Sequence, residues 1–359
     1  MLCSCISRLL SKQNLLVYHC KALLSTVNEN ILSSSIPTIT ESTAPIYDTK
    51  LLKVAIIGMP NAGKSTLING LMDRKVCPAS SKVHTTRTQA KAIFTAEDTQ
   101  IIFIDTPGLV NDREQKKFNL QKTFIRDYKT VSRDADIIGV IHDVSNIWTR
   151  ERLDIKIIKL LETQKTKPSF LVLNKIDVLK SKRKLLDLTR NLTENSLGGK
   201  PIESRKFTET EIESKGWPYF DHIFMVSSLT GDGLEEIREY LIYNAKPGEW
   251  MFPGDTWTDQ KAESVVINTV KAVLLNHMPQ EIPYKLQPKL EYFNSDEVTG
   301  KINAVVLIKC PTSRIAKLLA GASDGRLRLI TENVQRDLQD SFQNFVKIQI
   351  VPTPLADNE

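Results

Sequence analysis

The chain has 359 residues, of which 41% are hydrophobic, so it is too long for one ordinary domain and apolar enough to bury two cores. Its formal net charge of +6 permits a polyanionic partner but is too small to demonstrate one. Its five cysteines are clustered near the N-terminus or isolated, a pattern that supports neither a disulfide framework nor a zinc site.

The first 27 residues have the composition of a mitochondrial transit peptide. They contain three basic residues, no acidic residue, several serines and leucines that come in pairs. No apolar run among them is long enough for a secretory core or a membrane span. The alternative is an N-terminal segment that carries no targeting signal. Residues 28–48 are rich in Ser, Thr and Pro and are typical of a linker.

From residue 51 onward, short apolar runs alternate with helical patterns. The apolar runs predict strands at 51–57, 101–105, 136–144, 169–174 and 222–228. Helical spacing is found at 66–72, 151–162 and 234–242. This alternation predicts an α/β domain with a mostly parallel sheet and helices on both of its faces. The polar stretch 185–219 is interpreted as a surface insertion.

A break near 244–259, where Pro, Gly and Trp cluster, precedes a different order of elements. The elements expected beyond it are a helix at 262–277, strands at 285–293 and 301–310, two helices flanking Gly321, and a strand at 345–351. This order is typical of a small α+β domain. The predicted segments are therefore a leader with linker at 1–49, an α/β domain at 50–245, an interdomain linker at 246–261, a second domain at 262–352 and a tail at 353–359.

Residues Gly58 to Ser65 read GMPNAGKS and match the P-loop pattern between a predicted strand and a predicted helix. Gly58 and Gly63 let backbone N–H groups wrap a phosphate at the positive end of the helix. Lys64 is expected to reach the β- and γ-phosphates, and the Ser65 hydroxyl to bind magnesium. The strand and helix on either side argue against a chance match. The remaining residues expected to contact the nucleotide here are Met59, Pro60, Asn61, Ala62 and Thr66.

The strand at 101–105 leads into the sequence DTPGL. Asp105 is expected to stabilise the magnesium ion indirectly, by holding the groups that bind the ion. The Gly108 N–H can donate to the γ-phosphate and so report its presence. Thr86, in HTTRTQ, is the favoured threonine for completing magnesium coordination, with Thr85 as the alternative. The other nucleotide contacts expected in this element are Thr106, Pro107 and Leu109.

The sequence NKID follows the strand at 169–174 and determines which base is bound. The Asp177 carboxylate can accept two hydrogen bonds from guanine, a pairing that adenine cannot offer. Asn174 is expected to tie this loop to the P-loop, and the Lys175 stem to lie along the base. The accompanying residues are Ile176 and, after the next strand, Ser227, Ser228 and Leu229. These motifs in this order predict a protein that binds and hydrolyses GTP, with GTP or GDP and Mg²⁺ as ligands.

The residue after DTPG is Leu109, where many small GTPases have a glutamine that orients the attacking water. A leucine cannot orient water, so we expect slow intrinsic hydrolysis. Asn61, with loop carbonyls, is a candidate to hold a monovalent cation such as K⁺ near the phosphates. Together with Lys64, Thr86 and Gly108, it forms the expected catalytic set.

The motifs GMPNAGKST, KVHTTRTQ, DTPGL, NKID and SSL, followed by a domain opening near LLNHMPQEIPY, resemble the Era family of GTPases. The leader and HDVSNIWTR at 142–150 are most similar to its mitochondrial members. In that family the second domain is a type II KH domain, whose element order agrees with the order expected here. The resemblance implies binding to the 3′ region of mitochondrial small-subunit rRNA and assembly of that subunit in the matrix. It permits a peripheral inner-membrane contact, and we expect a monomer.

A KH domain holds about four nucleotides with a GXXG loop between two helices. Here the stretch from Gly321 to Gly325 reads GASDG: the second glycine is displaced by one position, and Asp324 adds a negative charge. The candidates for RNA contact are Gly321, Gly325 and the flanking Arg314, Lys317, Arg326 and Arg328.

Two other classes of function compete with RNA binding. In the first, the altered second domain docks a protein and GTP sets its affinity, which the GASDG loop favours. In the second, the chain is an RNA-modification GTPase of the related potassium-dependent kind. That class needs an attached catalytic domain and a reactive cysteine, for which the remaining length leaves no room.

Overall fold

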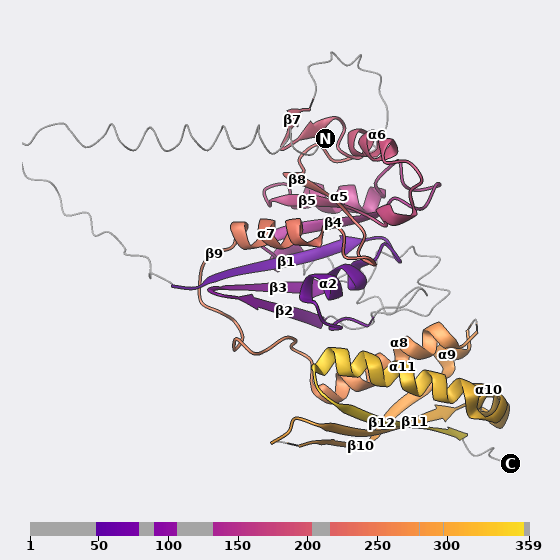
Figure 1. Cartoon of the computed structure of the whole chain (residues 1–359). Helices are drawn as coiled ribbons and strands as arrows, with labels where there is room; N and C mark the ends of the chain where they lie inside the picture. Colours follow the sequence, from indigo (N-terminus) through magenta and orange to yellow (C-terminus); the bar gives the residue numbers. More distant parts are fainter. Residues whose placement is uncertain are drawn as a thin grey trace, which may run out of the picture. The chain divides into compact units, whose positions relative to one another are not determined.

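A computed structural model describes residues 48–78, 90–105, 132–202, 216–279, 281–296 and 298–354, all within one compact unit, Tyr47–Glu359 (Figure 1). The predicted leader and most of the linker after it lie outside the described residues. In the described part of the chain, no helix is long and apolar enough to span a membrane. The described residues form two main sheets, each with its own helices, and a two-stranded hairpin.

The first sheet has the strand order β2-β3-β1-β4-β5-β8. Its strands are β1 (Lys50–Gly58), β2 (Ala90–Ala96), β3 (Thr99–Asp105), β4 (Ile137–Asp143), β5 (Ser169–Asn174) and β8 (His222–Val226). The pairs from β3 to β8 are parallel, and β2 is antiparallel to β3. The carboxyl ends of the parallel strands therefore meet at one edge, where ligands of open α/β sheets bind.

Helices cover both faces of this sheet, because successive side chains of its buried strands point to opposite sides. On one face, α2 (Lys64–Met72) and α7 (Leu234–Asn244) pack against Phe170 and Val172 of β5. On the other face, α5 (Ile155–Thr163) and α6 (Arg183–Leu192) pack against Leu171 and Leu173. Both faces of β5 are thus buried, which accounts for its continuous apolar run.

The interpretation of 185–219 as a surface insertion is corrected by α6. Leu188 and Leu192 lie in the core, and Trp217 and Phe220 are buried in the same cluster. Between them, β6 (Ser196–Leu197) and β7 (Lys200–Pro201) form a small hairpin. The polar average of this stretch comes from the solvent face of an amphipathic helix, while its leucines recur at helical spacing and pack inward.

The predicted linker at 246–261 is anchored to the first sheet. Its strand β9 (Lys246–Pro247) pairs antiparallel with β1. The buried Gln100 side chain accepts hydrogen bonds from the N–H groups of Met251 and Phe252 at 3.0 and 3.1 Å. It also donates to the Phe252 carbonyl at 2.9 Å. Because one buried amide satisfies three backbone groups, this segment has a defined path along the sheet.

The second sheet has the order β10-β11-β12, with strands Gln287–Ser295, Ile302–Cys310 and Val346–Pro354. The first pair is antiparallel and the second parallel. Its helices are α8 (Ala262–His277), the short α9 (Ile282–Lys285), α10 (Ser313–Ala320) and α11 (Gly325–Phe342). Alternate residues of β11 are buried against these helices. The α+β fold class is confirmed, although β12 continues two residues into the predicted tail.

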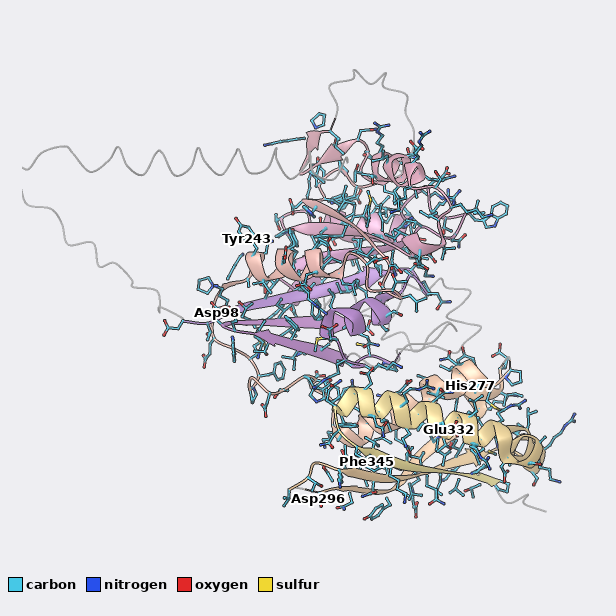
Figure 2. The ribbon with its side chains drawn as sticks, viewed as in Figure 1. Asp98, Tyr243, His277, Asp296, Glu332 and Phe345 are labelled. Carbon is cyan, nitrogen blue, oxygen red and sulfur yellow. The ribbon has the colours of Figure 1, made fainter. Side chains whose placement is uncertain are left out.

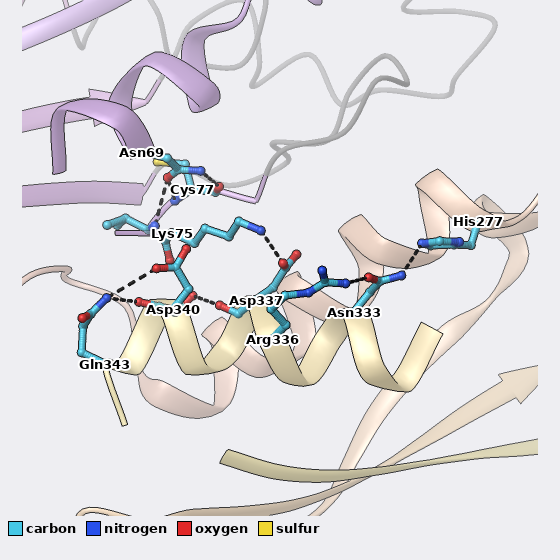
Figure 3. A network of polar contacts seen from close by, with 11 residues as sticks. Asn69, Lys75, Cys77, His277, Asn333, Arg336, Asp337, Asp340 and Gln343 are labelled. Carbon is cyan, nitrogen blue, oxygen red and sulfur yellow. Dashed lines mark hydrogen bonds and ion pairs between the residues drawn. The ribbon is translucent and has the colours of Figure 1, made fainter. Parts of the chain in front are cut away.

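The turn after α2 contacts α11 (Figure 3). The Ser341 hydroxyl donates to the Lys75 carbonyl at 2.5 Å, and the Lys75 ammonium forms an ion pair with Asp337. From α2, the Asn69 side chain accepts hydrogen bonds from two backbone N–H groups of the same turn, at 2.9 and 2.8 Å. The chain segment that follows the P-loop helix is therefore held from both sides.

Candidate functional site

The P-loop connects β1 to α2 and places Lys64 at the first position of the helix. The Lys64 ammonium donates to the carbonyls of Gly58 and Met59 at 3.1 and 3.0 Å, so it lies across the loop. Burial lowers the pKa of Lys64 from 10.5 to about 8, and the charge of Asp105 partly offsets this effect. A buried cation held at the centre of a backbone loop is suited to neutralise phosphate charge.

The two P-loop glycines are required by their neighbours as well as by the expected phosphate. At Gly63, φ is +100°, and a Cβ atom would lie 2.3 Å from the Asn174 side-chain nitrogen. At Gly58, a Cβ atom would lie 2.6 Å from the carbonyl oxygen of Ile141. Any side chain at either position would push the loop away from the strands that hold it.

Asn174, the first residue of NKID, joins three segments of the chain. Its amide nitrogen donates to the Ala62 carbonyl at 2.8 Å. Its Oδ1 oxygen accepts from the backbone N–H and the hydroxyl of Ser228, at 3.0 and 2.9 Å. Asn174 is 1% exposed, so these bonds form away from water. The structure thus brings together the P-loop, the NKID loop and the SSL loop. The bond from Asn174 to the P-loop is the one expected from the sequence, whereas the bonds to Ser228 were not expected.

The two described residues of the predicted magnesium site lie side by side. The Ser65 hydroxyl donates to the Asp105 carboxylate at 3.0 Å, and Asp105 is buried at the end of β3. Hydroxyl and carboxylate oxygens are the hard ligands that suit Mg²⁺. The ion would orient and neutralise the phosphates there. The other predicted residues of this region, namely Thr86, its alternative Thr85, Thr106, Pro107, Gly108 and Leu109, lie outside the described residues.

Beside this carboxylate lies Cys77, which the sequence gives no role. Burial, followed by the charge of Asp105, raises the pKa of the Cys77 thiol well above its ordinary value. Cys310 is also buried and free. A thiol held neutral in this way is unreactive, so Cys77 acts as an apolar packing residue.

The NKID loop turns sharply after Asn174. Lys175 has a left-handed backbone, with φ of 66°, and its ammonium pairs with the Asp143 carboxylate at 2.6 Å. Burial acts to raise the pKa of Asp143, but hydrogen bonds from Lys175 and Ser145 leave it below its ordinary value. Asp177 is exposed in the following turn and so accessible to a base. The Leu229 side chain is exposed as well.

A cavity of about 310 Å³ lies between the P-loop and the end of β4. Its lining residues are Met59, Pro60, Asn61, Ala62, Ile141, His142, Asp143, Asn146, Thr149, Arg152, Leu153 and Asp154. The His142 ring bonds to the Arg150 carbonyl at 2.9 Å, and burial lowers the His142 pKa. The sequence did not predict that residues between His142 and Asp154 line this cavity, because the loop after β4 carries no recognised nucleotide-binding motif.

A second hollow, of about 280 Å³, lies between α11 and β12. Its lining residues are Asp324, Leu327, Arg328, Thr331, Glu332, Ile348, Gln349 and Ile350. We call it the α11–β12 groove. Of the predicted RNA contacts, Arg328 lines it, whereas Arg326 donates to the Leu318 carbonyl at 2.6 Å and so joins α11 to α10. Arg314 and Lys317 are exposed on α10.

The sequence predictions missed the β12 side of the α11–β12 groove. Ile348, Gln349 and Ile350 belong to a strand that reads as ordinary core. The only signal was that an exposed glutamine separates two isoleucines. Contact of this strand with helix residues between Asp324 and Glu332, far earlier in the chain, cannot be read from that pattern.

Residues 53–175 match the family model described as a 50S ribosome-binding GTPase. The mitochondrial GTPase Era of Salmo salar is 33% identical over 348 residues, covering 84% of this chain and 76% of the relative. The mitochondrial GTPase Era of Danio rerio is 35% identical over 334 residues, covering 84% and 74%.

Two solved structures have a similar fold. One is Era in complex with MgGDPNP and nucleotides 1506-1542 of 16S ribosomal RNA, with a TM-score of 0.67 at 23% identity, covering 86% of this chain and 95% of that one. The other is Era of Aquifex aeolicus bound to GDP.AlF4-, with the same TM-score, identity and coverage. The P-loop, Asp105 and NKID meet at one edge of the sheet, and the mitochondrial relatives match most of the chain. This chain is therefore a GTPase of the Era family.

Proposed function

We propose that this GTPase binds single-stranded rRNA in the α11–β12 groove and assists assembly of the small mitochondrial ribosomal subunit. The observation that carries the proposal is the groove itself, which is lined by both apolar and polar side chains. It lies in a domain with the element order of a type II KH domain. Such domains bind unpaired nucleotides rather than duplexes.

The chemistry of the groove fits unstacked bases. Leu327, Ile348 and Ile350 provide apolar surface against which a base can lie. Gln349 offers both a donor and an acceptor for a base edge, and Arg328 offers a cation for a phosphate. A volume of about 280 Å³ suits a few groups of a nucleotide, not a folded partner.

The choice of RNA follows from the relatives. The solved Era that shares this fold is bound to nucleotides 1506-1542 of 16S ribosomal RNA. The curated relatives are named mitochondrial, in agreement with the transit-like composition of the first 27 residues. The corresponding partner in this chain's compartment is the 3′ region of the mitochondrial small-subunit rRNA, within a precursor of that subunit.

The remaining parts of the proposal concern the cation, the membrane and the oligomeric state. Asn61 lines the cavity beside the P-loop, where a K⁺ ion would lie near the phosphates. Hydrolysis that is equally fast in Na⁺ and K⁺ would exclude this role.

We place the protein in the matrix as a monomer, with at most a peripheral inner-membrane contact. Carbonate extraction tests the membrane contact, and gel filtration tests the oligomeric state.

The RNA-binding proposal is tested by crosslinking the full chain to RNA in cells, followed by sequencing, with Arg328→Ala alongside. Arg326 is kept, because its guanidinium holds α11 to α10. Lys289→Ala is the matched control: it removes one positive charge from β10, the strand at the opposite edge of the sheet from β12.

We expect a sharp peak near the 3′ end of the mitochondrial small-subunit rRNA. The peak should weaken several-fold in Arg328→Ala and persist in Lys289→Ala, because Arg328 lines the groove and Lys289 does not. Absence of rRNA enrichment in the wild-type sample would refute RNA binding and favour the protein-docking alternative.

A further inference from the structure

The loop between α10 and α11 places an aspartate where a phosphate clamp has its second glycine. Gly321 has a φ of 76°, and a Cβ atom there would lie 2.8 Å from the Arg326 Cβ, so this position requires glycine. Three residues later, Asp324 also has a left-handed backbone, with φ of 56°. Left-handed geometry of this kind is the usual reason for a glycine.

At Gly325, by contrast, neither the backbone conformation nor the surroundings require glycine. Its φ and ψ of −63° and −36° are ordinary helical values, and it is the first residue of α11. A Cβ atom at this position would meet nothing within 4 Å. The loop is therefore a four-residue GASD motif, from Gly321 to Asp324, and not a GXXG motif stretched by one residue. The apparent displacement of the second glycine in the sequence is corrected accordingly.

The Asp324 side chain belongs to the α11–β12 groove. It lines the hollow together with Arg328 and Glu332. Glu332 lies on α11, as Figure 2 shows. Aspartate before a helix often caps it, but here the left-handed backbone leaves the side chain without a capping hydrogen bond to α11. The carboxylate is exposed at the mouth of the groove.

A carboxylate at this position changes which part of a nucleic acid the loop can hold. Its negative charge repels a phosphate, which a GXXG loop would otherwise accept. It can accept hydrogen bonds, and the uncharged donors of a nucleic acid are the N–H groups of the bases and the ribose 2′-hydroxyl. The 2′-hydroxyl is the donor beside the 3′-phosphate, the group that a GXXG loop would hold, so it is the one that a carboxylate in this loop can meet. Acidic side chains bind ribose hydroxyls in this way in dinucleotide-binding folds. The same hydroxyl is what distinguishes RNA from DNA.

We propose that Asp324 accepts a hydrogen bond from a ribose 2′-hydroxyl, so that the α11–β12 groove selects RNA by its sugar and not by a phosphate clamp. This inference rests on the proposed RNA-binding function of the groove. It adds a specificity-determining residue and explains why an acidic side chain occupies the loop.

The test measures binding of the full chain to three labelled strands of one sequence, taken from the 3′ end of the small-subunit rRNA. The strands are RNA, 2′-fluoro RNA and DNA, each of about ten nucleotides, which exceeds the four that a KH groove holds. The 2′-fluoro strand keeps an RNA-like sugar but has no hydroxyl to donate. Fluorescence anisotropy gives the Kd for each strand.

The wild-type chain should bind RNA about tenfold more tightly than 2′-fluoro RNA, the range expected for one hydrogen bond to a charged group. In Asp324→Gly this ratio should fall to about one, while DNA binds more tightly because a phosphate can now approach. Asp324→Asn should keep part of the preference, since its amide oxygen still accepts. Gly325→Ala tests the GASD assignment and should keep the wild-type preference for RNA over 2′-fluoro RNA. Lys289→Ala, on β10 and outside the groove, is the control and should leave that preference unchanged.

Glycine and asparagine both tolerate a left-handed backbone, so these variants should fold, as thermal unfolding would check. If Asp324→Gly keeps the wild-type ratio while Arg328→Ala weakens RNA binding, the role of Asp324 is refuted and the groove remains an RNA site. If Gly325→Ala weakens binding as strongly as Asp324→Gly, the GASD assignment is refuted. If the wild-type chain binds none of the strands, the proposed function falls with the inference.

Discussion

Replacing Lys64 by methionine should stabilise the nucleotide-free protein while abolishing nucleotide binding. Lys64 is 7% exposed, and burial lowers its pKa from 10.5 to about 8. At pH 7 this shift corresponds to a penalty of roughly 3 kcal/mol for holding the charged group in the folded state. Methionine has a similar shape and carries no charge, so the Lys64→Met substitution removes this penalty.

The gain is partly offset by two lost hydrogen bonds. The Lys64 ammonium donates hydrogen bonds to the Gly58 and Met59 carbonyls. Loss of each bond is expected to lower the free energy of unfolding by about 1 kcal/mol. The net expectation is a free energy of unfolding raised by about 1–2 kcal/mol at pH 7. Nucleotide binding should be lost, because no cation remains to meet the phosphates.

The pH dependence has a definite sign. The pKa of Lys64 is lower in the folded than in the unfolded chain, so the unfolded chain binds more protons between pH 8 and pH 10.5. The stability of the wild type, measured against Lys64→Met, should therefore rise with pH through this window. The advantage of the variant is largest below pH 8 and disappears above pH 10.5.

The assay is urea unfolding of protein freed of nucleotide and magnesium, compared at several pH values. Lys159→Met, at an exposed position on α5, is the control and should change stability by less than about 0.5 kcal/mol. A Lys64→Met variant that is less stable than the wild type at pH 7, or whose difference does not vary with pH, would refute the argument.

Three further predictions concern buried contacts. Asn174→Ala should lower the free energy of unfolding by about 2–4 kcal/mol, because the Ala62 carbonyl and the Ser228 groups lose their partner away from water; urea unfolding measures it. Gly63→Ala should abolish binding of a fluorescent GDP, because the new methyl group would collide with Asn174. Ser341→Ala should cost about 1–2 kcal/mol and increase amide exchange in the turn after α2, since the Lys75 carbonyl loses its donor.

Each of these has a matched control. Asn191→Ala removes an exposed amide from α6 and should be nearly neutral. Gly248→Ala places its Cβ no closer than 3.6 Å to any neighbour, so GDP binding should persist. For Ser341, the control is Ser181→Ala, which removes an exposed hydroxyl. Equal effects of a variant and its control would show that the contact is not responsible.

The sequence by itself determined the parts of this protein that are contiguous. The P-loop needs two glycines, a lysine and a serine within eight residues, and NKID needs four in a row, so each motif is visible without a fold. The helix at 262–277 was predicted with the bounds that α8 has, because its apolar spacing is regular. The order of elements and the two fold classes follow from such local periodicity.

The tertiary structure alone decided which distant residues meet. Asn174 bonds to a carbonyl 112 residues earlier, and that partner depends on β1, β4 and β5 being neighbours in the sheet. The α11–β12 groove likewise exists only because β12 pairs with β11 and returns beneath the helix. Backbone angles were hidden too: the letters GASDG suggest a displaced glycine, whereas Ser323 and Asp324 are left-handed and Gly325 is helical. Local patterns report propensity, while strand order and dihedral angles are set by the packing of the whole chain.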